Sequence, residues 1–157
     1  LKEAHEAALD EIRHAELAFG LAKRFNGKNI QLGPLKESIV IKVKPSMRDL
    51  AMATTKEACV GETMSTLKMA KKLKREQDKE IVEMYKTVIE DESRHAALGW
   101  RTVKWAISKD KTLIKEVKEL LEESGWEKVL KELIKWLFGK EGNLEQIIQT
   151  TMKEYIE

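Results

Sequence analysis

Two short stretches of this sequence place a glutamate three residues before a histidine, and both have the same neighbours. The pattern Asp-Glu-x-Arg-His-Ala occurs at residues 10–15 and again at residues 91–96. On a helix, side chains three residues apart project from the same side, about one turn apart. Glu11 and His14 therefore form one candidate ligand pair, and Glu92 and His95 form a second.

Both pairs fall on the apolar stripe of an amphipathic pattern, where a carboxylate and an imidazole are costly unless they are paired or bound to a metal. A single Glu-x-x-His is usually a surface ion pair. Two copies with the same Asp and Arg neighbours favour a two-metal site in the core of a helical bundle. The chain has only three histidines, and the third, His5, lies off the stripe and is expected at the surface.

A third carboxylate is expected from the helix between the two motifs, where Glu57 and Glu62 are the candidates. Glu57 lines up with Met64 and with basic residues on a stripe that resembles a solvent face. Glu62 lines up with a small and apolar stripe, so periodicity favours Glu62 as the ligand. A π-bulge, which is common at such sites, would change this phase.

Cys59 and Thr66 lie about one turn to either side of Glu62. We expect them to line the pocket of the site, although both could equally be ordinary small core residues. Cys59 is the only cysteine, which excludes an internal disulfide and a Cys-rich zinc site and is typical of a reducing compartment. We therefore predict a cytoplasmic protein.

The composition is that of one helix-rich domain. The chain has 157 residues, of which 42% are hydrophobic and 36% charged, with 8 Gly and 2 Pro. Its 29 basic and 27 acidic residues are mixed along the chain and give a net charge of +2. The sequence has no basic stripe interleaved with aromatic residues, so nucleic-acid binding is not predicted. No apolar run approaches the roughly 20 residues that cross a bilayer, so no membrane association is predicted.

The predicted elements are amphipathic helices. Leu1 to Phe25 reads as one helix with alanines along its apolar stripe, ended by Asn26-Gly27. Residues 27–45 form a connection too long for a hairpin. This length suggests a crossover along a bundle, although its β-branched residues could also form a short strand-like cover.

A second helix is predicted from Ser46 to about Glu76, with Ser46 as N-cap. Asp78 then caps a third helix that runs to about Ile107 and packs antiparallel to the second. Residues 110–157 should add two or three helices, broken at Ser124-Gly125 and near residues 139–142. The expected organisation is a metal-binding bundle at 1–108 with the helices of 109–157 packed on it.

The paired motifs resemble those of the ferritin-like di-iron carboxylate superfamily, which includes rubrerythrins, bacterioferritins and the hydroxylase subunits of multicomponent monooxygenases. The stretch Ala-Cys-Val-Gly-Glu-Thr at 58–63 also resembles a segment of bacterial ferritin-like domain proteins. The resemblance covers about residues 1–108. It implies an all-α, ferritin-like helical bundle with a long crossover connection and, here, extra C-terminal helices.

The resemblance also implies roles for the residues of both motifs. Glu11 and Glu92 would bridge two metals, and His14 and His95 would each bind one of them. The Asp before each Glu, at positions 10 and 91, would hydrogen-bond the histidine of the opposite motif. Arg13 and Arg94 would compensate buried carboxylate charge, or else form outward salt bridges; both possibilities stay open.

One family feature has no counterpart in the sequence, namely a helix before the first Glu-x-x-His that carries a further glutamate. The chain starts at Leu1 within a helical pattern, so we expect N-terminal sequence to be missing. A homo-oligomer, a helix from another chain or a C-terminal helix would then supply this wall of the site.

The function implied by the resemblance is an oxidoreductase with two iron ions, or manganese and iron, that activates dioxygen or reduces peroxide. Electrons would come from an external donor, because the sequence has neither a cysteine cluster nor a Gly-rich dinucleotide motif. The alternatives are iron oxidation and storage, metal binding without turnover, and a metal-free helical interaction module.

Overall fold

The chain is helical throughout the part that its structure describes. This structure is a computed structural model, and it describes residues 1–28, 46–139 and 141–157. These ranges contain helices and turns but no strand, which confirms the predicted all-α class. The chain divides into two compact units, Leu1–Pro45 and Ser46–Glu157. The predicted crossover and its strand-like alternative fall on residues 29–45 and lie outside the described residues.

The first unit contains helix α1 (Lys2–Asn26), close to its predicted bounds. Gly27 ends the helix with φ 65°, a left-handed conformation that glycine adopts without strain, and its N–H donates to the Lys23 carbonyl. No residue of α1 is buried, and Phe25, predicted on the apolar stripe, is 67% exposed. The unit has no second helix among its described residues against which α1 could bury a face.

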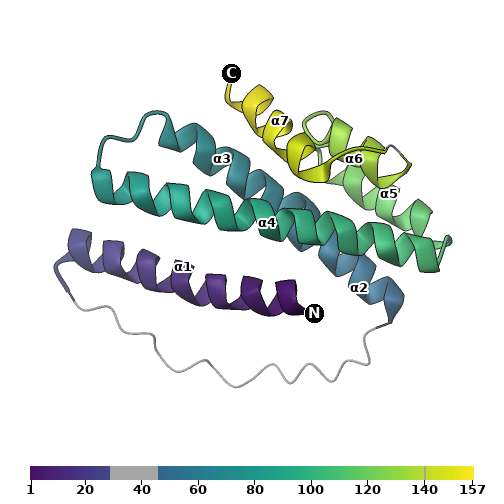
Figure 1. The fold of residues 1–157 in the computed structure, drawn as a ribbon, viewed down its shortest axis with the longest axis horizontal. Helices are drawn as coiled ribbons and strands as arrows, with labels where there is room; N and C mark the ends of the chain where they lie inside the picture. Colours follow the sequence, from purple (N-terminus) through teal and green to yellow (C-terminus); the bar gives the residue numbers. More distant parts are fainter. Residues whose placement is uncertain (29–45, 140) are drawn as a thin grey trace. The chain divides into compact units, whose positions relative to one another are not determined.

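The second unit begins with a long helical rod. Helix α2 (Met47–Thr54), the π-helical stretch η1 (Thr55–Glu62) and helix α3 (Thr63–Leu73) follow one another without a break, and the rod crosses α4 in Figure 1. The Ser46 hydroxyl accepts from the Asp49 amide and the Asp49 carboxylate accepts from the Ser46 amide, which forms a capping box. The predicted N-cap is therefore confirmed.

Helix α4 (Lys79–Lys109) follows the rod after a short turn and packs against α2, η1 and α3. The Asp78 side chain accepts from the amides of Glu80 and Ile81 at 3.0 and 3.3 Å, so this predicted N-cap is confirmed as well. The pair α3–α4 is the antiparallel hairpin that the sequence predicts (Figure 1).

Three further helices complete the second unit: α5 (Leu113–Glu123), α6 (Lys131–Leu137) and α7 (Leu144–Ile156). Gly125 separates the first two and has φ 72°, and Gly142 lies just before the third with φ 154°. Helix α5 packs on α2 and η1, α6 on α4, and α7 on α3 and α4. These helices belong to the same compact unit as α2 to α4, so the structure divides the chain after Pro45.

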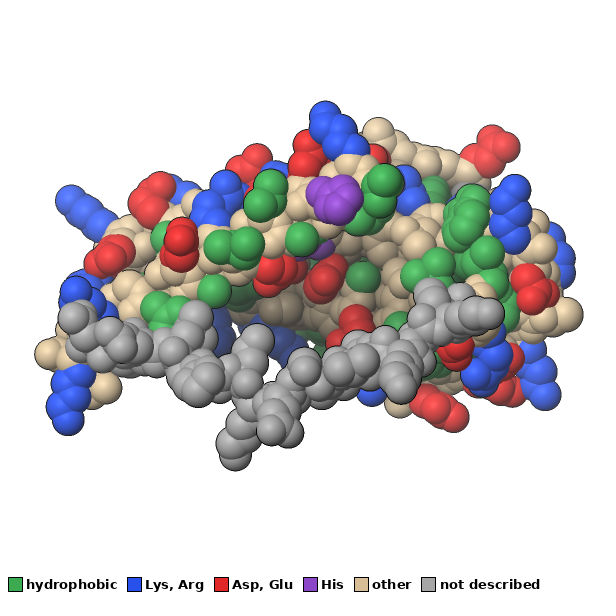
Figure 2. Space-filling model, turned by 90° about the horizontal axis from the view of Figure 1, so that it is seen from below, with side chains coloured by type: hydrophobic (Ala, Val, Ile, Leu, Met, Phe, Trp, Pro, Cys, Tyr) green, Lys and Arg blue, Asp and Glu red, His purple; other side chains and the backbone are tan. Residues whose placement is uncertain are grey.

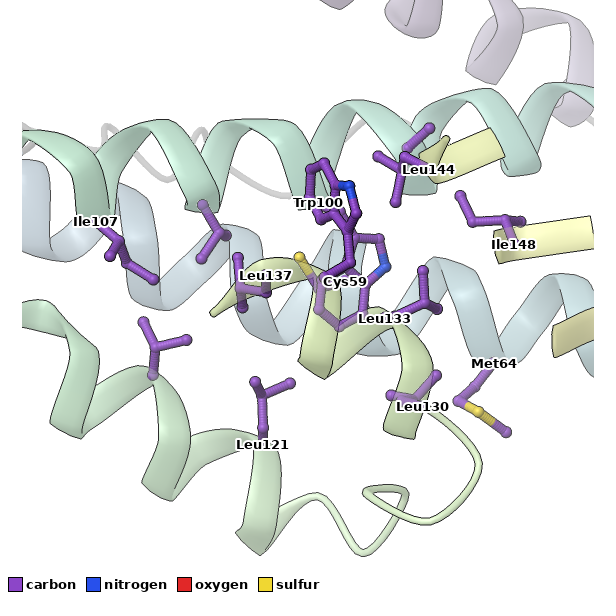
Figure 3. Close-up of a cluster of buried hydrophobic side chains, with 14 of the residues drawn as sticks. Cys59, Met64, Trp100, Ile107, Leu121, Leu130, Leu133, Leu137, Leu144 and Ile148 are labelled. Atoms are coloured by element: carbon purple, nitrogen blue, oxygen red, sulfur yellow. The ribbon is translucent and has the colours of Figure 1, made fainter. Parts of the chain in front are cut away.

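The core of the second unit lies between the α3–α4 pair and the C-terminal helices (Figure 3). Trp100 of α4 is fully buried and belongs to the same hydrophobic cluster as Leu121 of α5 and Leu133 of α6. Met64, which periodicity places on the solvent face with Glu57, is only 3% exposed. That expectation was wrong because a π-helical stretch precedes Met64 and α7 packs on α3.

The Asp78 cap provides a test of how the hairpin is held. Replacing Asp78 with alanine removes the acceptor for two amides at the start of α4 and should lower the free energy of unfolding by about 1 kcal/mol. Urea denaturation measures the loss. Lys79→Ala, at the exposed neighbouring position, is the matched control and should stay within about 0.5 kcal/mol of the wild type. Equal effects of the two substitutions would contradict the capping role.

Candidate metal centre

Helix α4 presents the second motif on its core face. The buried residues of this helix include Asp91, His95, Gly99 and Val103, which follow one another at intervals of four. His95 therefore lies on the same stripe as the packing residues, as the sequence predicts. The Glu92 side chain is 12% exposed, so both side chains of the pair are withdrawn from solvent.

The π-helical stretch carries Glu62 as its last residue. A threonine at the start of the stretch and another in the first turn of α3 bond back to the preceding turn. The Thr55 hydroxyl donates to the Ala51 carbonyl at 2.7 Å, and the Thr66 hydroxyl donates to the Glu62 carbonyl at 2.8 Å. A π-helix has one residue more per hydrogen-bonded turn than an α-helix, so it shifts the face that the following residues present.

Glu62, Glu92 and His95 come together in the second unit. One ligand atom from each of the three lies within 4.8 Å of the other two. The distance between His95 Nδ1 and Glu92 Oε2 is 3.6 Å, which is too long for a hydrogen bond. Ligands about 2.1 Å from one ion are separated by roughly 3–4 Å, so small side-chain rotations suffice to place all three on one metal.

The competing candidate from the sequence, Glu57, is exposed and belongs to no such group. The structure thus brings Glu62, the residue favoured by periodicity, to the second motif. Among the described residues of α5, α6 and α7, no carboxylate joins a group with metal-ligand spacing. The expectation that a C-terminal helix supplies a wall of the site therefore gains no support.

A buried carboxylate beside this group is neutralised from its own helix. The Asp91 side chain is 4% exposed and accepts from Arg94 at 2.8 Å. Arg94 is itself about half exposed, so its charged end bridges the buried carboxylate and solvent. Arg94 also lies 4.0 Å from the exposed carboxylate of Glu90, so both roles considered for this arginine, compensation of a buried charge and an outward salt bridge, stay open. The predicted hydrogen bond from each Asp to the opposite histidine stays a prediction.

The first motif has the same internal geometry on α1. His14 Nδ1 lies 3.7 Å from Glu11 Oε1, and Arg13 donates to Asp10 at 3.0 Å. The Glu11 side chain is 58% exposed. Within its own unit the first pair is thus arranged like the second. The participation of Glu11 and His14 in the metal centre stays a prediction that rests on the repeat.

The two residues expected to line a pocket are both buried. Burial raises the pKa of the Cys59 thiol well above its usual range, and the negative charge of Glu62 raises it further. Cys59 therefore stays a neutral thiol at neutral pH. The Thr66 hydroxyl is engaged with the backbone of Glu62. A surface pocket of about 270 Å³ lies at α6 and α7, lined by residues such as Glu141 and Ile147. The pocket expected at Cys59 and Thr66 stays a prediction.

Sequence reasoning missed the residues that hold η1 against α4. An ideal Cβ placed on Gly99 would lie 2.4 Å from the Ala58 Cβ, so the two backbones approach as closely as glycine allows. The Trp100 indole N–H donates to the Thr63 hydroxyl at 3.1 Å, within the buried core. A glycine inside the otherwise regular pattern of α4 was the available signal for such an approach.

Charges of both signs share the face drawn in Figure 2. Figure 2 shows Lys and Arg side chains interspersed with Asp and Glu over the face in view. None of the helices in the described ranges has the length and apolar character of a membrane span.

No protein-family model, curated protein or solved structure matches this chain. The function is therefore inferred from the residues and their geometry.

The Asp91–Arg94 pair should be unusually sensitive to substitution. Arg94→Gln removes the cation that donates to the buried Asp91 carboxylate at 2.8 Å and should lower the free energy of unfolding of the metal-free protein by about 1–3 kcal/mol. Arg101→Gln is the matched control, because Arg101 of the same helix pairs with an exposed carboxylate, Glu145. Its cost should stay below about 1 kcal/mol. If denaturation finds equal losses, Asp91 is not effectively buried.

Proposed function

We propose that this chain binds a redox-active transition metal, iron in the first place, through Glu62, Glu92 and His95. The observation that carries the proposal is the convergence of these three side chains from two packed helices, with ligand atoms within 4.8 Å. Exposed acidic clusters are common without a metal. This group differs because its histidine is buried and its glutamates are largely withdrawn from solvent.

The donor set fits such a metal. Two carboxylates and one imidazole supply the mixed oxygen and nitrogen ligands that suit iron and manganese. The two negative charges balance one divalent cation, which offsets the cost of burying both carboxylates side by side. Cys59 does not belong to this group, so among the described residues the set contains no soft thiolate of the kind that favours zinc or copper.

The proposal extends to two metals and to oxidoreductase chemistry. The second ligand pair is Glu11 and His14, and its inclusion rests on the sequence repeat and on the resemblance to di-iron carboxylate proteins. When bound, iron or manganese supplies a redox-active centre for activating dioxygen or reducing peroxide. The electrons come from an external donor, because the chain has one cysteine and no dinucleotide-binding motif.

The residues of this chain hold and shield the metal. Glu62 and Glu92 supply charge, and His95 supplies a ring nitrogen from a buried position. Asp91 and Arg94 bring one negative and one positive charge next to these ligands without changing the net charge there. Thr63, the residue after Glu62, and Trp100, which donates a hydrogen bond to it, are both buried, so the dry core adjoins the site at Glu62.

Metal binding by the proposed ligands can be tested against a matched position. Glu62→Gln and His95→Ala should each weaken binding of ferrous iron under anaerobic conditions by more than about tenfold, since each removes a ligand. Glu57→Gln, five residues away on the same rod and exposed, should bind iron like the wild type. Equilibrium dialysis with elemental analysis measures both. A loss in Glu57→Gln but not in Glu62→Gln would move the ligand to Glu57.

The reaction class is tested with the iron-loaded protein. After anaerobic loading and elemental analysis, dioxygen or hydrogen peroxide is added in the presence of a chemical reductant. The expected result is an optical change that decays as the reductant is consumed over many turnovers. Iron that is oxidised and retained without further consumption of reductant would indicate storage. A folded protein that retains no iron would favour the alternative of a metal-free interaction module.

A further inference from the structure

The closest approach between η1 and α4 lies one turn from the proposed ligands on both helices. Ala58 precedes Glu62 by four residues, and Gly99 follows His95 by four. A Cβ on Gly99 would lie 2.4 Å from the Ala58 Cβ. Ordinary contacts between carbon atoms are about 3.5–4.0 Å. A methyl group at position 99 therefore requires the two backbones to separate by about 1 Å.

A second contact fixes the same register. Thr63, which follows Glu62 directly, accepts a hydrogen bond from the Trp100 indole at 3.1 Å. Both residues are buried, with exposed fractions of 2% and 0%. Glu62 therefore lies between two residues that contact α4, namely Ala58, which packs on Gly99, and Thr63, which is hydrogen-bonded to Trp100.

We propose that Gly99 is a positioning residue for the metal centre, because its missing side chain sets the distance at which Glu62 meets Glu92 and His95. This inference rests on the proposed function. Two ligands of one ion are at most about 4.2 Å apart when each lies about 2.1 Å from the metal. The three ligand atoms lie within 4.8 Å of one another. A separation of the helices by about 1 Å would add to the distance that the Glu62 side chain has to close.

The Ala58 methyl cannot turn aside, since it is attached directly to the backbone. The remaining Ala58 atoms near the added Cβ are its carbonyl carbon and Cα, both at 3.4 Å. Removing the methyl from Ala58 therefore makes room for a methyl at Gly99. The double variant Ala58→Gly/Gly99→Ala moves one methyl group from one helix to the other and should keep the spacing.

The experiment compares the wild type, Gly99→Ala, Ala58→Gly and the double variant. Binding of Mn²⁺ alone is followed by the loss of the free-ion signal in electron paramagnetic resonance. Unfolding of each metal-free protein is measured in urea. Gly99→Ala should bind Mn²⁺ more than about tenfold more weakly, the size of loss typical when the support of a ligand is removed. Ala58→Gly and the double variant should bind within about threefold of the wild type.

A Gly99→Ala protein that is less stable but binds Mn²⁺ like the wild type would overturn the inference, because glycine would then serve packing only. Weak binding by a folded double variant would overturn it as well. If Gly99→Ala does not fold, the double variant decides, because it retains the new methyl without the clash. Glu62→Gln is measured alongside these proteins. If the wild type binds no more Mn²⁺ than Glu62→Gln does, both the proposed function and this inference are wrong. If the wild type binds Mn²⁺ tightly and Gly99→Ala binds it equally well, only this inference is wrong.

Discussion

The second unit depends on keeping ionisable side chains inside a packed pair of helices. Asp91 and His95 are buried on α4, and Glu62 and Glu92 are largely withdrawn from solvent. Each of these groups is costly in an apolar core unless another charge or a metal compensates it. Arg94 compensates Asp91 from the same helix. The remaining group of two carboxylates and one imidazole has the composition of a cation site, and this constraint connects the packing of the helices to the proposed function.

The π-helical stretch is the local means by which the rod satisfies this constraint. In an uninterrupted α-helix, the stripe that contains Ala51 and Thr55 would continue with a fixed phase through residue 73. The wider turns of η1 shift the phase, so that Met64 and Leu67 enter the core while Glu62 faces the motif on α4. Small residues allow the two helices to approach closely here. Ala58 faces Gly99 of α4, where a Cβ would lie 2.4 Å from the Ala58 Cβ.

Much of this arrangement could be predicted because it is encoded locally. The caps at Ser46 and Asp78 and the stop at Gly27 follow from side-chain and backbone chemistry within a few residues. The choice of Glu62 over Glu57 followed from periodicity. Met64 was misplaced because periodicity assumes a regular helix and does not reveal which later helix covers a face. The pairing of Ala58 with Gly99 joins residues 41 positions apart, and only the folded chain shows it.

The position of the proposed ligands along the chain has a consequence for how the site forms. Glu62, Glu92 and His95 all belong to the hairpin of η1, α3 and α4, whose two arms are joined by a short turn. A metal site carried by one hairpin is assembled when that hairpin packs, and packing here is secured by the core shared with α5 to α7 (Figure 3). The three proposed ligands are therefore held by the fold of the second unit itself. Side chains held in this way lose little conformational entropy on binding an ion, which is the advantage that the proposed metal site would gain from the hairpin.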